Sequence, residues 1–137
     1  MADVLTPQQR SRNMAAIKSK DTKPELLVRK FLFANGYRYK LHDKTLAGKP
    51  DIVLLKHNTI IFVHGCFWHG HKHCKYATIP KTRTEWWLNK INNNIQRDKL
   101  HTKELKKQGW QIITIWECEL KKKKLNTTLL KLLKQLL

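Results

Sequence analysis

Acidic side chains are scarce in this chain. Its 137 residues include 10 Asp and Glu but 28 Lys and Arg, which gives a net charge of +18. The basic residues run from Arg10 to Lys134 and do not collect in one tail, so the folded body itself must be positive. Such a field attracts polyanions, and nucleic acid is therefore the leading class of partner. A lysine-rich protein without that partner, or a ribosomal or chaperone-like RNA binder, would share the same charge.

Long apolar runs are also missing. No stretch approaches the roughly 20 residues that a membrane-spanning helix needs, and the N-terminus lacks the apolar segment of a secretory signal. We therefore expect a cytoplasmic protein with no membrane partner. Cysteine is rare as well, and three cysteines cannot all pair within the chain. Metal ligation explains Cys66, Cys74 and Cys118 better than disulfide bonds do in an intracellular protein.

The hydrophobic pattern predicts one domain built on a mixed sheet. A chain of this length can bury a core but leaves no room for a second domain. Capping residues and periodicity predict helices at 7–18, 22–36 and 82–109, strands at 37–42, 51–55, 60–64 and 110–118, and a basic amphipathic helix in the tail. The central order of helix, three strands, helix and strand indicates an α/β or α+β sandwich. We expect the tail helix to pack on its own sheet, with a membrane surface or a partner as the alternative.

The stretch HGCFWHGHKHC, residues 64–74, has the ligand types of a structural zinc site. Such a site needs four soft or borderline ligands, some closely spaced and one brought in by the fold. Cys66, His71 and Cys74 supply the local ligands, and Cys118 at the end of the last strand can supply the fourth. His73 competes with His71, although its position next to Cys74 makes joint ligation awkward. The alternative is three buried thiols beside a histidine-rich surface loop.

Asp51 begins a strand directly after Gly48-Lys49-Pro50. A carboxylate at this position weakens strand pairing unless it has a task or a hydrogen bond. A hairpin would bring it beside the backbone near Val63 and close to His64 and His69. One carboxylate can hold Mg²⁺ while an imidazole activates water, which is the equipment for phosphodiester hydrolysis. Alternatively, Asp51 is a turn or cap residue and the two histidines are bystanders.

Glu25 has a purely structural explanation from the residues alone. It follows Thr22 by three positions, where a capping box expects a carboxylate that reaches back to the Thr22 amide.

Several segments together resemble the very-short-patch-repair (Vsr) endonuclease family. They are KSKDTKPE, GKPDIVL, IIFVHGCFWHGHKHC, PKTRTEWWLNKI and QGWQIITIWECEL, and they span the chain from about Thr6 to Leu120. The resemblance implies a restriction-endonuclease-like core at 21–120, an N-terminal DNA-contacting arm at 1–20 and a C-terminal helix at 121–137. It also implies nicking of one DNA strand on the 5′ side of the T in a T:G mismatch that arises from deamination of 5-methylcytosine. Double-stranded DNA is then the partner of a monomeric enzyme associated with the nucleoid, with mismatch-repair proteins as further partners.

The resemblance also implies roles for single residues. Asp51 looks like the carboxylate that binds catalytic Mg²⁺ together with the Val63 backbone carbonyl. His69 looks like the general base, and His64 and Glu25 look like its supporting residues. The structural Zn²⁺ would be held by four residues, Cys66, His71, Cys74 and Cys118. Two features differ from some relatives: Val63 stands where they have Thr, and the H-K-H-C loop is one residue longer, so His71 and His73 both remain candidates.

Aromatic residues near the site resemble a wedge that enters the DNA stack. Phe67, Trp68 and Trp87 correspond to the inserted side chains, and a mismatched step is the least costly one to unstack. Met14 on the arm would press from the opposite groove. Two residues, Lys90 and Asn94, resemble those that lie near the mispaired bases. Without the resemblance, the three rings would be assigned to the core.

Three functions compete at this point. The first is a Mg²⁺-dependent mismatch endonuclease. The second is a zinc-stabilised nucleic-acid-binding module without catalysis, which would not need Asp51 and His69. The third is a related nuclease with another DNA specificity. Because Asp51 and His69 are both present, the sequence favours the enzyme.

Overall fold

The predicted order of elements is found in the computed structural model, which describes residues 21–137. The elements are α2 (Lys23–Ala34), β1 (Lys40–Leu41), β2 (Ile52–Leu54), β3 (Thr59–His64), α3 (Thr84–Lys107), β4 (Gln111–Trp116) and α4 (Leu125–Leu136), with short 3₁₀ turns at Leu55–His57, Lys75–Ala77 and Glu117–Leu120. The helix expected at 7–18 lies outside the described residues, as does Met14.

The four strands form one mixed sheet in the order β1-β2-β3-β4. The first three are antiparallel neighbours, and β4 returns parallel to β3 after the long helix α3. A parallel pair needs such a crossover connection, which explains why the longest helix lies between these strands. The register sets Ile52 opposite Ile61 and His64 opposite Trp116.

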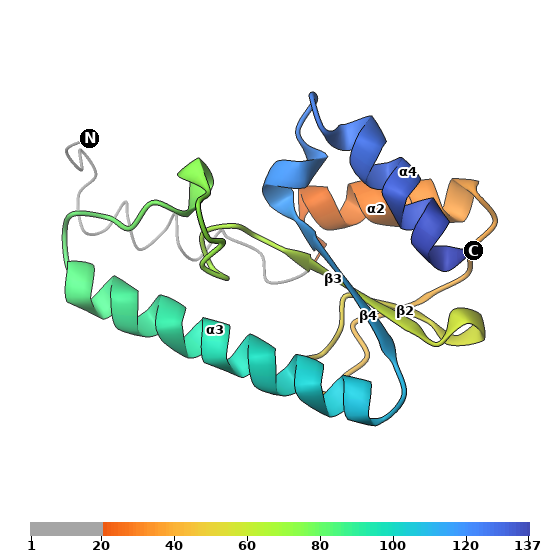
Figure 1. The fold of residues 1–137 in the computed structure, drawn as a ribbon, viewed down its shortest axis with the longest axis horizontal. Helices are drawn as coiled ribbons and strands as arrows, with labels where there is room; N and C mark the ends of the chain where they lie inside the picture. Colours follow the sequence, from red (N-terminus) through yellow and green to blue (C-terminus); the bar gives the residue numbers. More distant parts are fainter. Residues whose placement is uncertain (1–20) are drawn as a thin grey trace.

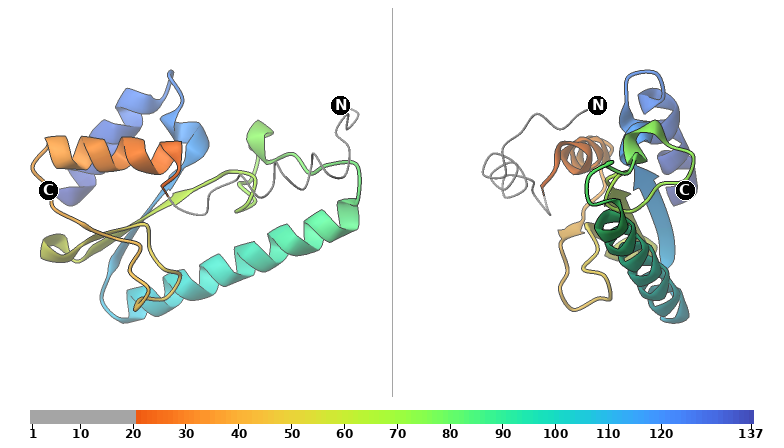
Figure 2. Two further views of the ribbon diagram at one scale, coloured as in Figure 1. Left: turned by 180° about the vertical axis from the view of Figure 1, so that it is seen from behind. Right: turned by 90° about the vertical axis from the view of Figure 1, so that its left-hand side faces the viewer.

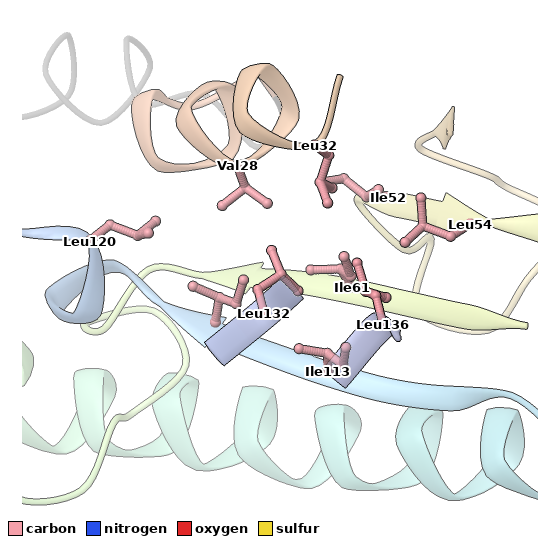
Figure 3. Close-up of a cluster of buried hydrophobic side chains, with 10 residues drawn as sticks. Val28, Leu32, Ile52, Leu54, Ile61, Ile113, Leu120, Leu132 and Leu136 are labelled. Atoms are coloured by element: carbon pink, nitrogen blue, oxygen red, sulfur yellow. The ribbon is translucent and has the colours of Figure 1, made fainter. Parts of the chain in front are cut away.

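Helices cover both faces of the sheet, with α2 and α4 on one face and α3 on the other (Figures 1 and 2). Side chains of a strand alternate between its two faces, so neighbouring positions of β2 and β3 enter different layers. Ile52, Leu54 and Ile61 pack under α2 and α4, where Leu132 and Leu136 of α4 are also buried (Figure 3). On the opposite face, the buried residues are Val53, Ile60, Phe62 and Leu105. The prediction that the tail helix packs on its own sheet is confirmed.

Helix α2 begins at the predicted cap, but Glu25 does not complete the expected capping box. The Thr22 hydroxyl accepts the Glu25 N–H at 3.4 Å, as a helix cap should. The Glu25 carboxylate, however, accepts the N–H of Asp21 and not that of Thr22. The same carboxylate also contacts Arg29 and His42, which hold it away from the Thr22 N–H that a capping box would require.

Several predicted elements are longer than the observed ones. Strand β1 covers only two residues of the expected 37–42: residues 37–39 lie outside the sheet, and the strand ends before His42, which has a left-handed backbone with φ of 48°. The predicted strands 51–55 and 110–118 both give way to 3₁₀ turns at their C-terminal ends. Helix α3 begins at Thr84 after Arg83, whose φ is 56°, without a side-chain cap.

Among the described helices, none combines the length and the apolar character needed to cross a bilayer.

Candidate functional site

A cavity of about 560 Å³ lies where the ends of β2 and β3 approach α3. Four predicted site residues line it: Asp51, Val63, His64 and His69. Its lining also includes three cationic residues, Lys44, Lys49 and Arg97. A polar cavity with converging ionisable groups and cationic lining residues suits an anionic substrate.

Asp51 and Val63 are neighbours across the antiparallel pair. The Val63 N–H donates to Asp51 Oδ2 at 2.8 Å. In a strand, the N–H and C=O of one residue face the same side, so the Val63 carbonyl faces the side on which Asp51 lies. Burial raises the pKa of Asp51 to about 6, although the Val63 hydrogen bond opposes this rise. The negative charge of Glu25 raises the pKa further.

Glu25 is buried, with 1% of its surface exposed, and its carboxylate has a complete set of donors. Arg29 Nη1 lies 2.9 Å from Glu25 Oε2, and His42 Nε2 lies 3.1 Å from the same oxygen. The other oxygen accepts the Asp21 N–H at 3.3 Å. Buried carboxylates are stable only when paired in this way, so Glu25 is both a structural residue and a neighbour of Asp51.

His64 and His69 stack face to face, with ring centroids 3.8 Å apart and an interplanar angle of 3°. His69 Nδ1 lies 2.6 Å from Asp98 Oδ2. Burial lowers the pKa of His64 to about 4, and the neighbouring His69 lowers it further, so His64 is neutral at pH 7. The Nδ1 atom of His64 is the one buried side-chain polar atom without a hydrogen-bond partner in the described part of the chain.

Asp98 was not among the site residues predicted from the sequence. This residue lies on α3, 29 positions after His69, and its carboxylate holds the histidine ring. A signal was available, because Asp98 follows Asn94 by four residues and so lies on the helix face already assigned to DNA. His42 was also missed, since it was read as the last residue of a strand.

The four predicted zinc ligands meet in one cluster. One ligand atom from each of Cys66, His71, Cys74 and Cys118 lies within 4.8 Å of all the others. His73 is not part of this cluster and is exposed. Three thiols and an imidazole are a soft donor set that fits Zn²⁺. Burial raises the pKa of Cys66 to about 12, so a bound cation would be needed to keep this thiol ionised.

Phe67, Trp68 and Trp87 form a cluster of rings at the start of α3. Their centroids lie 5.2 to 5.8 Å apart, and all three side chains are half-buried. They belong to neither of the two buried core clusters. The loop that carries Phe67 and Trp68 packs closely on α3 at Gly70, where a Cβ would lie 2.6 Å from Ile95.

Two further predicted residues lie on the same helix. Asn94 donates its Nδ2–H to the backbone oxygen of Trp68 at 2.8 Å, so it holds the aromatic loop. Lys90 is exposed.

Comparisons with known proteins agree on one family. A family model described as "DNA mismatch endonuclease Vsr" matches residues 2–76. The type II nicking enzyme V.NmeAIP of Neisseria meningitidis is 54% identical over 123 residues, which cover 90% of this chain and 87% of that protein. The DNA mismatch endonuclease Vsr of Escherichia coli is 42% identical over 121 residues, covering 88% and 77% of the two chains. The type II nicking enzyme V.XorIIP of Xanthomonas oryzae is 44% identical over 120 residues, or 88% of each chain.

Proposed function

The chain belongs to the Vsr family of DNA mismatch endonucleases, and we propose that it nicks one strand of double-stranded DNA on the 5′ side of the T in a T:G mismatch, with Mg²⁺ as cofactor. The observation that carries the proposal is the meeting of Asp51, His64 and His69 in one cavity with cationic lining residues. A T:G mismatch has no two-fold symmetry, so a monomer suffices.

Asp51 and the Val63 carbonyl would hold Mg²⁺, since hard oxygen ligands suit this ion. When bound, Mg²⁺ supplies charge neutralisation at the scissile phosphate. The chain itself contributes further positive charge, because Lys44, Lys49 and Arg97 surround the cavity and attract the DNA backbone.

His69 is the general base of this proposal. Its Nδ1–H donates to Asp98, which leaves Nε2 free to accept a proton from the attacking water. The Asp98 carboxylate stabilises the positive charge that then develops on the ring. His64 is neutral beside it, so the stacked ring adds no repulsion to the protonated His69.

The cluster of Cys66, His71, Cys74 and Cys118 would hold structural Zn²⁺. With four protein ligands, the ion has no open position for substrate, so its role is to brace the loop. The rings of Phe67, Trp68 and Trp87 would enter the DNA base stack beside the mismatch. Lys90 and Asn94 would lie near the mispaired bases. Met14 would contact the DNA from the opposite groove.

The proposal is tested with end-labelled duplexes that differ only by T:G or T:A. Wild-type protein and Asp51→Ala are compared with Mg²⁺ or EDTA, in several sequence contexts that include cytosine-methylation motifs. We expect a Mg²⁺-dependent nick beside the mismatched T that Asp51→Ala abolishes while DNA binding is retained. Glu104→Ala is the matched control, because this exposed carboxylate of α3 does not line the cavity.

Each other outcome has a clear meaning. Turnover by Asp51→Ala would remove Asp51 from the mechanism. Equal cutting of both duplexes would indicate a nuclease with another specificity. Binding without a nick in any context would indicate a zinc-stabilised binding module.

A further inference from the structure

We propose that His42, which lines the catalytic cavity, is a positioning residue that links the Glu25 carboxylate to the segment that carries Asp51. The inference rests on the proposed function, because it assigns His42 to the same site. Nothing in the sequence pattern singled out this histidine.

The backbone of His42 is tied to the residue that carries the site's central carboxylate. Its N–H donates to the Asp51 carbonyl at 3.2 Å, immediately beyond the last paired residues of β1 and β2. The φ of His42 is 48°, in the left-handed region that residues with a Cβ rarely adopt. Such a conformation persists when surrounding contacts hold it, and it is common at functional sites.

The side chain of His42 is tied to α2. Its Nε2 lies 3.1 Å from Glu25 Oε2 and 3.3 Å from Asp21 Oδ1. Both oxygens are acceptors when ionised, so the hydrogen must be on Nε2 of the ring. His42 therefore joins the segment that enters β2 to the helix that carries Glu25.

Two side chains lie against Glu25 Oε2, and they differ in position. Arg29 donates a hydrogen bond to it, also bonds Asp21 at 2.6 Å and does not line the cavity. The His42 ring hydrogen-bonds Asp21 and contacts Glu25 Oε2 at 3.1 Å, and it lines the cavity together with Asp51, His64 and His69. His42 is thus the neighbour of Glu25 that also belongs to the cavity wall. Without it, Arg29 and the Asp21 N–H remain as the contacts of the carboxylate.

The test compares three substitutions with wild-type protein on the T:G duplex. His42→Gln can still donate a hydrogen bond to Glu25, whereas His42→Leu has similar bulk but no donor. His42→Asn tolerates the left-handed backbone but is too short to reach Glu25, which keeps the test valid if the leucine variant melts below the assay temperature. Kd for DNA, kcat, the Mg²⁺ concentration for half-maximal nicking and Tm are measured for each.

We expect His42→Leu and His42→Asn to lower kcat by about tenfold or more, the usual effect of losing a residue that orients a metal-site carboxylate. They should also require more Mg²⁺, while Kd for DNA changes little. His42→Gln should stay within about threefold of wild type. His57→Leu is the matched control, because His57 is exposed and lies outside the cavity. Wild-type activity in His42→Leu and His42→Asn, or equal losses in all three variants, would overturn the proposal.

A second readout does not depend on nicking. The ¹⁵N NMR signals of the His42 ring, assigned by their loss in His42→Asn, should show hydrogen on Nε2, and Glu25→Gln should shift them. A ring with hydrogen on Nδ1 alone would contradict the proposal even in an active enzyme. If wild-type protein does not nick any duplex, the proposed function fails while the NMR result still tests the contact.

Discussion

Burial acts on the pKa values of Asp51 and His64 in opposite directions, and the resulting ionisation states are those that the proposed hydrolysis requires. It raises the pKa of the Asp51 carboxyl to about 6 and lowers the pKa of the His64 imidazole to about 4. At pH 7.5, Asp51 is therefore ionised and His64 is neutral. The ionised carboxylate is less stable in this cavity than it would be in the unfolded chain, so the site reduces the stability of the metal-free protein.

Because the buried, ionised Asp51 carboxylate destabilises the fold, we predict that Asp51→Asn stabilises the metal-free protein at pH 7.5. The folded pKa of about 6 exceeds the ordinary value of 3.8. The stabilising contribution of Asp51 is therefore present below about pH 4 and is lost as the pH rises through 6. Asparagine carries no charge and its Oδ1 can still accept the Val63 N–H. We expect a gain of at most about 3 kcal/mol in the free energy of unfolding, measured by urea denaturation in EDTA.

The pH dependence distinguishes this effect from a general improvement in packing. The advantage of Asp51→Asn should shrink as the pH is lowered from 7.5 to 4.5. Glu104→Gln, an exposed change on α3, should be neutral at both values. An advantage of equal size at both pH values would show that charge burial is not its cause.

Among the elements, β4 links the predicted metal cluster to the paired histidines of the cavity through its last residue, Trp116. The Trp116 ring stacks on His71, with centroids 4.0 Å apart, and meets His64 edge-on, with centroids 5.2 Å apart. His64 in turn stacks on His69. Because these rings pack in a continuous row, we expect a change in the position of His71 to move the ring pair in the cavity.

We therefore predict that Cys118→Ser lowers both metal content and activity. The serine is similar in size but is a poor ligand for Zn²⁺, and a structural zinc site contributes directly to folding. We expect loss of bound zinc, a decrease in Tm of about 10 °C or more and a lower kcat. Elemental analysis, thermal melting and the nicking assay measure these changes.

His73→Ala is the control for the metal site. His73 lies next to Cys74 but outside the ligand cluster, so its removal should leave zinc content and Tm unchanged. Normal zinc content in Cys118→Ser would show that Cys118 is not a zinc ligand. Loss of zinc in His73→Ala would show that His73, and not His71, is the histidine ligand.

Local patterns were sufficient to predict most elements, because helix periodicity and strand composition depend on neighbouring residues. They identified α2, β3, α3 and β4, and the motif around residues 64–74 identified the metal cluster. They failed where contacts between distant segments decide the outcome. The Asp98 carboxylate meets His69 only because α3 folds back across the sheet, and the left-handed backbone of His42 depends on Asp51 and Glu25.

Across the molecule, the aromatic cluster and the proposed general base are adjacent. Trp68 precedes His69 directly in the loop after β3. Helix α3 carries a contact for each, since Trp87 lies against Trp68 and Asp98 holds the His69 ring. If the rings insert beside a mismatch as proposed, His69 would lie next to the inserted Trp68, and the cut would fall close to the distortion.

Trp68→Ala tests this coupling between recognition and cutting. An aromatic ring that stacks on a base contributes about 1–3 kcal/mol, and the cost of opening the stack is lowest at a mismatched step. Binding to T:G duplex should therefore weaken by about fivefold or more, while binding to T:A duplex, which depends on backbone charge, changes less. Tyr76→Ala is the matched control, because Tyr76 is an exposed aromatic outside the ring cluster and should affect both duplexes alike. Fluorescence anisotropy titrations at one fixed salt concentration give the six affinities, for wild type and the two variants on each duplex. Equal losses on both duplexes for Trp68→Ala would mean that the ring adds general contact area, and mismatch selection would then have to come from residues other than this wedge.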